Sequence, residues 1–283
     1  MSPLSRLSRL SGHSRAALAA RLRGAGCVFA EDEAELLAAG ARTPAHLDAL
    51  AERRIAGEPL EHVLGWAEFC GLRLAVDPGV FVPRRRTEFL VRQAARLLSP
   101  RSGPAVIVDL CCGSGALGAA LVAGAGHRRF PGVAGAELHA VDIDPAAVRC
   151  ARRNLAAPGG HVHRGDLFAP LPAALRGRVD VLLANVPYVP TEEIGLLPAE
   201  ARIHEARVAL DGGADGLDVV RRVAAGAGGW LAPGGALLFE TGERQAARAL
   251  EIVGRGGLTA RKVTSDELNA TVVIGVRGPG PAG

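Results

Sequence analysis

The stretch "AVIVDLCCGSGALG", residues 105–118, passes from a continuous apolar run to two glycines and then to small apolar residues. A short Val/Ile/Leu run bounded by turn residues is typical of a strand buried on both faces. Gly113 and Gly115 let the backbone pass close to a ligand, and the helix expected next would offer free N–H groups at the same place. The stretch predicts a strand–loop–helix unit with a ligand site at its loop.

The same alternation of strand and helix continues to the end of the chain. Further apolar strands are expected at residues 136–144, 161–166, 179–185, 235–240, 260–264 and 271–276. Helical stretches separate most of them, which is the pattern of a mostly parallel sheet with helices on both faces. The final two strands have no helical spacer, so the last strand is expected to enter by a hairpin. We predict an α/β fold.

The N-terminal part has a different pattern, because its apolar residues recur at helical spacing and each run stops near a glycine. Thr43 is expected to be the N-cap of one helix, with Pro44 at its first position. We predict a helical domain, a β-hairpin linker and an α/β domain, over residues 1–65, 66–86 and 87–283. The linker is expected to turn at residues 77–79 ("DPG"), and Thr87 is expected to cap the helix that follows.

Composition bounds the class of protein. The 283 residues are 48% hydrophobic with a net charge of +4, and no apolar run reaches the roughly 18 residues of a membrane span. Five cysteines without a C-x-x-C pair argue against a disulfide framework or a zinc site. The Ser- and Arg-rich start is interpreted as a basic helix start rather than a transit peptide. No secretory apolar core follows it, which favours the cytoplasm.

Two clusters of polar residues are not expected to form binding sites. Arg84, Arg85 and Arg86 are expected to form a solvated face rather than a nucleic-acid contact. His161 and His163 lie on one face of a predicted strand, but no third ligand is near, so no metal site is expected.

Polar side chains stand at the ends of the four strands that begin the sheet. Asp109 lies at the end of the first, and Asp142, Asp166 and Asn185 follow the next three. Ligands of open α/β sheets bind outside the carboxyl ends of the strands, where an acid such as Asp142 can accept hydrogen bonds from a ribose diol. The first loop has neither a full G-x-G-x-x-G nor a P-loop lysine, which disfavours a dinucleotide dehydrogenase.

These motifs together resemble the class I S-adenosylmethionine-dependent methyltransferases, and more closely the release-factor glutamine methyltransferase family. The similarity covers nearly the whole chain. It rests on the linker of residues 57–88 and then on "DLCCGSG", "AVDIDPAAVRCARRNL", "GDLF", "NVPY", "ALDGGADGLDVVRR" and "LAPGGALLFETGERQ" in order. The resemblance implies a Rossmann-like, seven-stranded, mostly parallel sheet with an N-terminal helical domain, S-adenosyl-L-methionine as cofactor, and a peptide chain release factor as the protein substrate of a monomeric enzyme.

The resemblance also implies the cofactor site. The loop of Cys111, Cys112, Gly113, Ser114 and Gly115 would cradle the methionine part of the cofactor. Asp142 would hold the ribose, Asp166 and Leu167 would flank the adenine, and Asn185 would border the same site. For Asp109, direct contact with the ligand and ordering of the loop stay open as alternatives.

The tetrapeptide Asn185-Val186-Pro187-Tyr188, which contains the chain's one tyrosine, suits transfer of a methyl group to an amide. The amide nitrogen is a poor nucleophile because its lone pair is delocalised into the carbonyl. Acceptors at the Asn185 side chain and the Val186 carbonyl could orient its two N–H groups. Pro187 keeps Val186 extended, and Tyr188 offers a flat face for a planar amide to stack on.

Four residues, at three places in the chain, depart from the family's pattern. Val186 stands where a proline is usual, Cys111-Cys112 where Gly-Thr is usual, and Arg86 where an acid is usual. Two alternatives to a protein glutamine methyltransferase remain open. One is methylation of an exocyclic amine of DNA adenine or RNA, although the chain has no aromatic-rich basic patch. The other is a cofactor-binding module without activity, against which Asn185, Asp142 and Asp166 argue.

Overall fold

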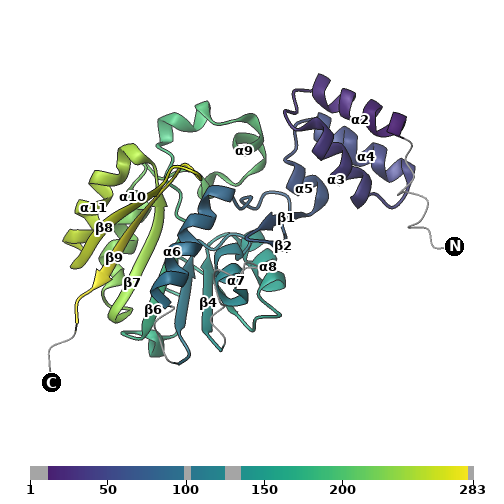
Figure 1. Ribbon diagram of the computed structural model, residues 1–283. Helices are drawn as coiled ribbons and strands as arrows, with labels where there is room; N and C mark the ends of the chain where they lie inside the picture. Colours follow the sequence, from purple (N-terminus) through teal and green to yellow (C-terminus); the bar gives the residue numbers. More distant parts are fainter. Residues whose placement is uncertain (1–11, 99–102, 125–134, 280–283) are drawn as a thin grey trace.

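The computed structural model describes residues 12–98, 103–124 and 135–279, and the Ser- and Arg-rich start before residue 12 lies outside them. Figure 1 shows a group of helices at the N-terminal end of the molecule beside a larger unit built on a sheet. None of the described helices combines the length and apolar character that a membrane span requires.

The N-terminal segment is helical, as its sequence pattern predicts. Its helices are α2 (Gly12–Gly24), α3 (Ala30–Gly40), α4 (Pro44–Ile55) and α5 (Leu60–Leu64). The Thr43 hydroxyl accepts a hydrogen bond from the His46 amide at 3.1 Å, which confirms the predicted cap. Leu22, Leu37 and Ala51 are fully buried between these helices, so this segment has a small apolar core of its own.

The linker hairpin turns earlier than the sequence indicated. Strands β1 (Trp66–Phe69) and β2 (Leu72–Ala75) pair antiparallel around Cys70 and Gly71. Both turn residues have positive φ, 51° and 75°, which matches the right-handed twist of a two-residue hairpin. The prediction of a hairpin turn at residues 77–79 was therefore wrong. That segment makes a separate turn after β2, in which the Val80 amide donates to the Asp77 carbonyl at 3.0 Å.

The sheet has the predicted strands and the predicted mostly parallel arrangement. Its order is β5-β4-β3-β6-β7-β9-β8, and only β9 runs antiparallel to its neighbours, entering through the β8–β9 hairpin. The strands are β3 (Val106–Leu110), β4 (Glu137–Asp142), β5 (His161–Arg164), β6 (Val179–Ala184), β7 (Leu231–Thr241), β8 (Leu258–Ser265) and β9 (Ala270–Arg277).

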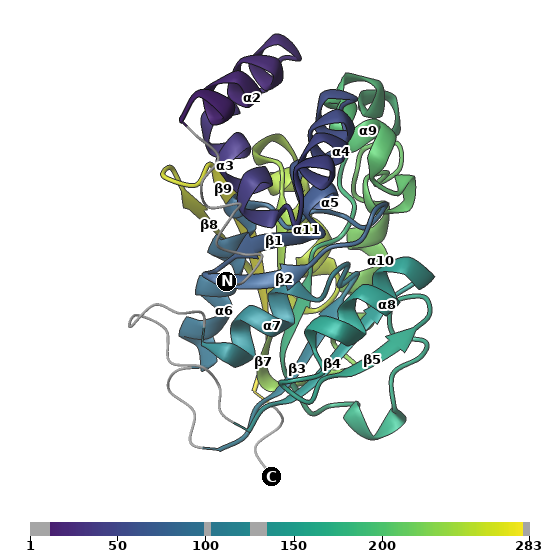
Figure 2. The ribbon, with the colours of Figure 1, turned by 90° about the vertical axis from the view of Figure 1, so that its right-hand side faces the viewer.

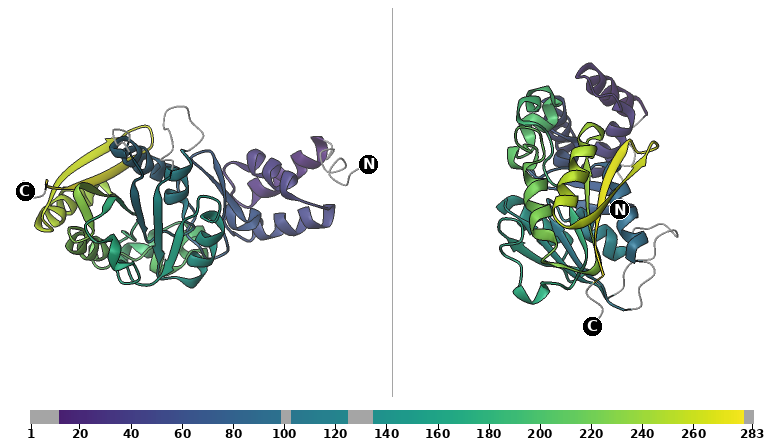
Figure 3. Two further views of the ribbon diagram at one scale, coloured as in Figure 1. Left: turned by 90° about the horizontal axis from the view of Figure 1, so that it is seen from below. Right: turned by 90° about the vertical axis from the view of Figure 1, so that its left-hand side faces the viewer.

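Helices cover both faces of this sheet (Figures 2 and 3). One face packs against α6 (Glu88–Leu98), α7 (Ala116–Ala123) and α8 (Pro145–Asn154), and the other against α10 (Asp218–Ala227) and α11 (Ala246–Arg255). Alternate residues of β3 enter the two cores, since Ile107 faces the first and Val108 the second. Short 3₁₀ turns occur in the connections between the helices and strands, at Arg85–Thr87, Ala173–Leu175 and Glu243–Gln245.

The start of α6 differs from the prediction that Thr87 caps it. A 3₁₀ turn runs directly into this helix, and the Thr87 hydroxyl donates to Oε2 of Glu240 at 2.7 Å. Glu240 is only 3% exposed at the end of β7, and a buried carboxylate must be supplied with donors. The capping role was wrong because this long-range contact takes the hydroxyl.

The parallel register aligns the ends of three strands. Leu110 of β3 pairs with Val141 of β4 and with Ala184 of β6. The next residue on each strand is a predicted site residue: Cys111, Asp142 and Asn185. The hydrogen-bond ladder therefore brings these residues to one edge of the sheet.

A segment between β6 and α10 lies next to this edge and contacts the N-terminal half of the chain. We call residues 191–209 the cover segment; it contains 3₁₀ turns at Thr191–Leu196 and Arg207–Ala209 and helix α9 (Ala199–His204). The Ala206 amide donates to the Gly79 carbonyl at 3.2 Å. Arg54 of α4 reaches Oε1 of Glu200 with Nη1 at 2.6 Å while its Nε holds Glu33 at 2.6 Å. The N-terminal helices are thus tied to the cover segment.

We predict that Arg54→Met lowers the free energy of unfolding by about 3–5 kcal/mol, because it leaves the buried carboxylate of Glu33 without its cation. Arg23→Met is the matched control, since the Arg23–Glu31 pair is exposed and its loss should cost less than about 1 kcal/mol. Urea unfolding of both variants measures the difference. Equal losses would show that burial of the Arg54 pair is unimportant.

Candidate active site

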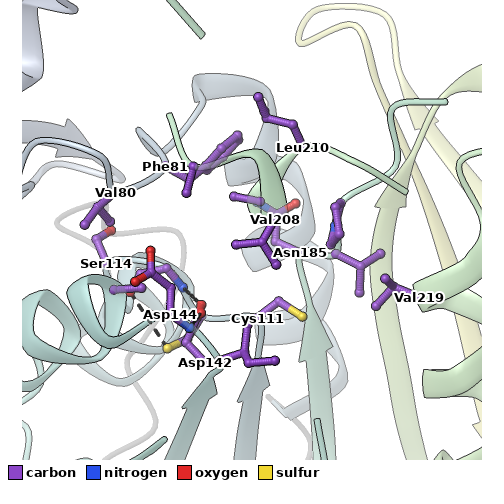
Figure 4. Close-up of a pocket in the computed structure, with 18 of the residues that line it drawn as sticks. Val80, Phe81, Cys111, Ser114, Asp142, Asp144, Asn185, Val208, Leu210 and Val219 are labelled. Carbon is purple, nitrogen blue, oxygen red and sulfur yellow. Dashed lines mark hydrogen bonds between the residues drawn. The ribbon is translucent and has the colours of Figure 1, made fainter. Parts of the chain in front are cut away.

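A cavity of about 610 Å³ opens at the carboxyl edge of the sheet. The loops after β3, β4, β5 and β6 line one side of it, and the linker residues Val80 and Phe81 with the cover segment line the other. Figure 4 shows Cys111, Asp142 and Asn185 on neighbouring strand ends beneath Phe81. The arrangement places a ligand bound on the strand ends in contact with the cover segment.

Most of the predicted site residues line this cavity. They are Cys111, Cys112, Gly113, Ser114, Asp142, Asp166, Leu167, Asn185, Val186, Pro187 and Tyr188. Asp109 and Gly115 are not among the lining residues.

Asp109 lies beneath the loop rather than in the cavity. Its side chain is completely buried, and its Oδ2 accepts a hydrogen bond from the Gly118 amide in the first turn of α7 at 3.0 Å. Burial raises the pKa of the Asp109 carboxyl to about 7. Gly115 has φ +77°, and a Cβ there would lie 3.1 Å from Leu155. Of the two alternatives for Asp109, the geometry favours ordering of the loop.

Asp142 fastens two of the loops to each other. Its Oδ2 accepts from the Gly113 amide at 2.8 Å, and its Oδ1 accepts from the Asp144 amide at 2.9 Å. Burial raises the pKa of Asp142, and the two amide donors partly offset this rise. A carboxylate offers about four acceptor sites, so two remain for a ligand.

The loops after β3 and β5 contain residues with positive φ that line the cavity. Gly113 has φ +55°, and a Cβ at this position would meet no atom within 4 Å, so the backbone borders open space. Cys111 and Leu167 are non-glycine residues with positive φ, 54° and 47°, and both line the cavity. Such conformations cost about 1–3 kcal/mol and cluster at ligand sites. Burial raises the pKa of both Cys111 and Cys112, so their thiols stay neutral.

The cavity lining also includes a basic residue that the sequence did not indicate. It is Arg222 of α10, which forms an ion pair with Asp166. The local sequence gives no sign of this pair, because 56 positions separate its members.

The tetrapeptide 185–188 is held against a glycine-rich loop. A Cβ at Gly212 would lie 2.8 Å from the Pro187 carbonyl oxygen, and one at Gly216 would lie 2.3 Å from the Tyr188 carbonyl oxygen. Gln245 Nε2 donates to that Tyr188 oxygen at 2.9 Å. Only glycine allows this approach of two backbone segments, which gives the "DGGADG" motif a structural role that sequence reasoning missed.

Two residues of the tetrapeptide that line the cavity carry acceptor groups, the side-chain oxygen of Asn185 and the backbone carbonyl of Val186. Among the described residues, none donates a hydrogen bond to the Asn185 side chain or to the Val186 carbonyl. The Val186 side chain is 2% exposed and anchors the loop in the core of the α10 face. Two acceptors are therefore available to a ligand beside Asp142 and Cys111.

The Tyr188 hydroxyl has protein partners at both of its hydrogen-bonding positions. It donates to Oε1 of Glu240 at 3.0 Å and accepts from Nη2 of Arg86. Burial first, and then the Glu240 charge, raise the pKa of Tyr188. Tyr188 lines the cavity, and the two hydrogen bonds of its hydroxyl fix the position of its ring.

The arginine cluster is not simply a solvated face. Arg85 is exposed, as expected, but Arg84 pairs with Glu205 at 2.6 Å and Arg86 with Glu240 at 2.7 Å. Both carboxylates are buried, with side-chain exposures of 0% and 3%. The prediction was wrong for these two arginines because it could not include partners more than a hundred positions away.

His161 and His163 lie on β5, which is the outermost strand on one side of the sheet. His163 Nε2 is 3.0 Å from His139 Nδ1, and the His139 ring stacks on both His161 and His163. In the described part of the chain, no group of three or more His, Cys, Asp or Glu side chains is arranged to hold a metal ion.

Comparison with known proteins decides the family. The model of the methyltransferase small domain matches residues 71–223. A release factor glutamine methyltransferase of Geobacter sulfurreducens is 37% identical over 230 residues, which cover 81% of this chain and 76% of the relative. The chain belongs to the release factor glutamine methyltransferase family.

Two further comparisons agree with this assignment. The family member from Mycolicibacterium smegmatis is 41% identical over 213 residues, covering 75% of this chain and 70% of the relative. The crystal structure of a methyltransferase from Pyrococcus furiosus aligns with a TM-score of 0.51 at 16% identity, covering 74% of this chain and 90% of that chain. At that identity it supports the methyltransferase fold alone.

We predict that Gly216→Ala destabilises this family member more than Gly257→Ala does. Both glycines have positive φ, which costs a non-glycine residue about 1–2 kcal/mol. At Gly216 the added Cβ also meets Tyr188 and Gln245, whereas at Gly257 it meets no atom within 4 Å. Overpacking should add about 1–3 kcal/mol in urea unfolding. Equal losses would mean that the tetrapeptide is not held by this contact.

Proposed function

We propose that this protein transfers a methyl group from S-adenosylmethionine to the side-chain amide nitrogen of a glutamine in a peptide chain release factor. The observation that carries the proposal is the pair of unpartnered acceptors, the Asn185 amide and the Val186 carbonyl, beside the loops expected to hold the cofactor. The names of the relatives support the choice of substrate.

The lining residues fit the proposed cofactor. Gly113 leaves an open cradle over the strand end, and the neutral Cys111 and Cys112 thiols beside it are small. Asp142 keeps free acceptor sites for a ribose diol, and Asp166 with Leu167 borders the place expected for adenine. When bound, S-adenosylmethionine supplies a methyl group on a positively charged sulfur.

The tetrapeptide orients the substrate amide. A primary amide has two N–H donors, and the Asn185 oxygen and the Val186 carbonyl can accept one each. Two fixed acceptors hold the plane of the amide and stabilise positive charge that develops on its nitrogen. The N–CH₃ bond forms as the bond between the methyl group and sulfur breaks, and the amide proton that is displaced passes to water. The ring of Tyr188, fixed at its hydroxyl, forms a wall against the amide plane.

A protein substrate is favoured over a nucleic-acid base. The cavity lining includes apolar residues of the linker and the cover segment, among them Phe81, Leu197 and Val208. Two of the three arginines in the basic cluster are paired with buried carboxylates rather than free for phosphates. Recognition of single-stranded bases would use aromatic platforms, and the chain is 4% aromatic.

We propose that the helical segment of residues 1–65 serves in substrate recognition, separate from the linker of residues 66–86 and the catalytic domain of residues 87–283. Its Val28 and Phe29 are exposed by 82% and 69%, and its Arg54 contacts the cover segment at Glu200. We also propose a monomer that works in the cytoplasm, where its substrate would be translated and used.

Asn185→Ala should lower the rate of methyl transfer about 10²–10³-fold while leaving the fold intact, because it removes one acceptor from the substrate amide. Single-turnover methylation of a purified release factor measures the rate, and thermal melting checks the fold. Asn269→Gly is the control for loss of an asparagine, since this residue lies outside the cavity lining and its positive φ of 46° suits glycine. A wild-type rate in Asn185→Ala would show that the tetrapeptide is only a turn.

Asp142→Ala should weaken binding of S-adenosylhomocysteine about 10- to 150-fold, since it removes a charged acceptor. Asp32→Ala is the matched control, because Asp32 is an exposed carboxylate of α3 that does not line the cavity, and this variant should keep the wild-type affinity. Calorimetry with the cofactor product measures both affinities. Equal affinity in the wild type and Asp142→Ala would exclude Asp142 from the ribose site.

A further inference from the structure

Four side chains meet at the edge of the Tyr188 ring, and we call Arg86, Thr87, Tyr188 and Glu240 the tyrosine anchor. Oε1 of Glu240 accepts from Arg86 Nε at 2.7 Å and from the Tyr188 hydroxyl at 3.0 Å, while Oε2 accepts from Thr87 at 2.7 Å. Arg86 also donates a hydrogen bond from Nη2 to the hydroxyl oxygen of Tyr188. The hydroxyl thus sits between a cation and an anion that are themselves joined.

The anchor depends on its buried carboxylate. Glu240 is 3% exposed at the end of a central strand, so its position is set by the sheet and not by the loop. A buried carboxylate is costly without a cation, and Arg86 supplies one. Arg86 comes from the linker and Tyr188 from the loop after β6, so Glu240 fixes both relative to the sheet.

The tetrapeptide needs such a restraint because of Val186. Pro187 keeps residue 186 extended, but valine has no ring to fix its own φ and leaves Asn185 free of the restriction that a following proline imposes. The carbonyl of Val186 must nevertheless point into the cavity. A tether on Tyr188, two residues further on, limits the same backbone from its other end.

We infer that Arg86 is a positioning residue for methyl transfer, which fixes Tyr188 through Glu240 and so replaces the backbone restraint that a proline at residue 186 would give. The inference rests on the proposed function, and it assigns a role to an arginine that stands where the family usually has an acid. Arg86 acts through Tyr188 and the tetrapeptide, and it needs no contact with the reacting atoms.

A double-mutant cycle tests the compensation. Arg86→Met should lower kcat about 10- to 100-fold in single-turnover and steady-state methylation of a release factor, with little change in the KM for S-adenosylmethionine. In a Val186→Pro background the same substitution should cost at least about threefold less, because proline supplies the restraint. Arg86→Lys should recover part of the rate, since lysine keeps the charge.

Two further variants separate positioning from folding. Arg85→Met removes the same charge from the exposed neighbour, which does not line the cavity, and should retain the wild-type rate. Tyr188→Phe cuts the anchor at the hydroxyl while leaving the Arg86–Glu240 pair in place, and should reproduce most of the loss in kcat. An equal loss from Arg86→Met in the wild-type and Val186→Pro backgrounds would overturn the compensation.

The chain's one tyrosine gives a readout that does not depend on activity. Protein labelled with 3-fluorotyrosine has one ¹⁹F resonance, from residue 188. Arg86→Met should shift and narrow this resonance as the ring becomes mobile, and Arg85→Met should leave it unchanged. A resonance that Arg86→Met does not alter would refute the anchor. If wild-type protein methylates no release factor, the proposed function fails, and the resonance still decides whether Arg86 holds the ring.

Discussion

The parallel register of β4, β3 and β6 is the constraint on which the site depends. Leu110 pairs with Val141 and with Ala184, so the next residues, Cys111, Asp142 and Asn185, emerge side by side. No side-chain contact is needed to bring them together, because the backbone ladder does so. The loop expected to hold the cofactor and the tetrapeptide expected to hold the substrate are therefore aligned by the same hydrogen bonds that build the sheet.

Three carboxylates, one partly buried and two buried, then fix the loops that leave this edge. Asp142 accepts hydrogen bonds from the amides of Gly113 and Asp144. Glu240 accepts hydrogen bonds from Arg86 and from the Tyr188 hydroxyl. Glu205 of the cover segment accepts from the Val82 amide and from Arg84, and so joins this segment to the linker. Each carboxylate is costly to bury and so fixes the donors that approach it. The loops that line the cavity therefore keep their positions, because they are hydrogen-bonded to carboxylates that are withdrawn from solvent.

Local and periodic features of the fold could be predicted from the sequence. The strands follow from their apolar runs, and the Thr43 cap with Pro44 follows from chemistry within a few residues. The hairpin turn was placed at residues 77–79 because "DPG" has strong turn propensity, whereas the actual turn uses Cys70 with positive φ, which propensity does not indicate. Most of the residues that line the cavity at the strand ends could also be predicted, because they belong to the sequence motifs that indicated the family.

The rest could not be predicted because it depends on partners distant in sequence. Arg86 and Glu240 are 154 positions apart, and Arg54 and Glu200 are 146 apart. One sequence gives no pairing for such charges, so an arginine is expected to be solvated by default. The role of Gly216 was also hidden, since it depends on the close approach of Tyr188.

We propose that this edge of the sheet presents a glutamine amide for methylation. Tandem mass spectrometry of a purified release factor, after incubation with this protein and isotopically labelled S-adenosylmethionine, tests it most directly. We expect one labelled methyl group on the side-chain nitrogen of a single glutamine. A methyl group on another residue type, or label on adenine-containing nucleic acid offered in the same reaction and not on the protein, would contradict the claim.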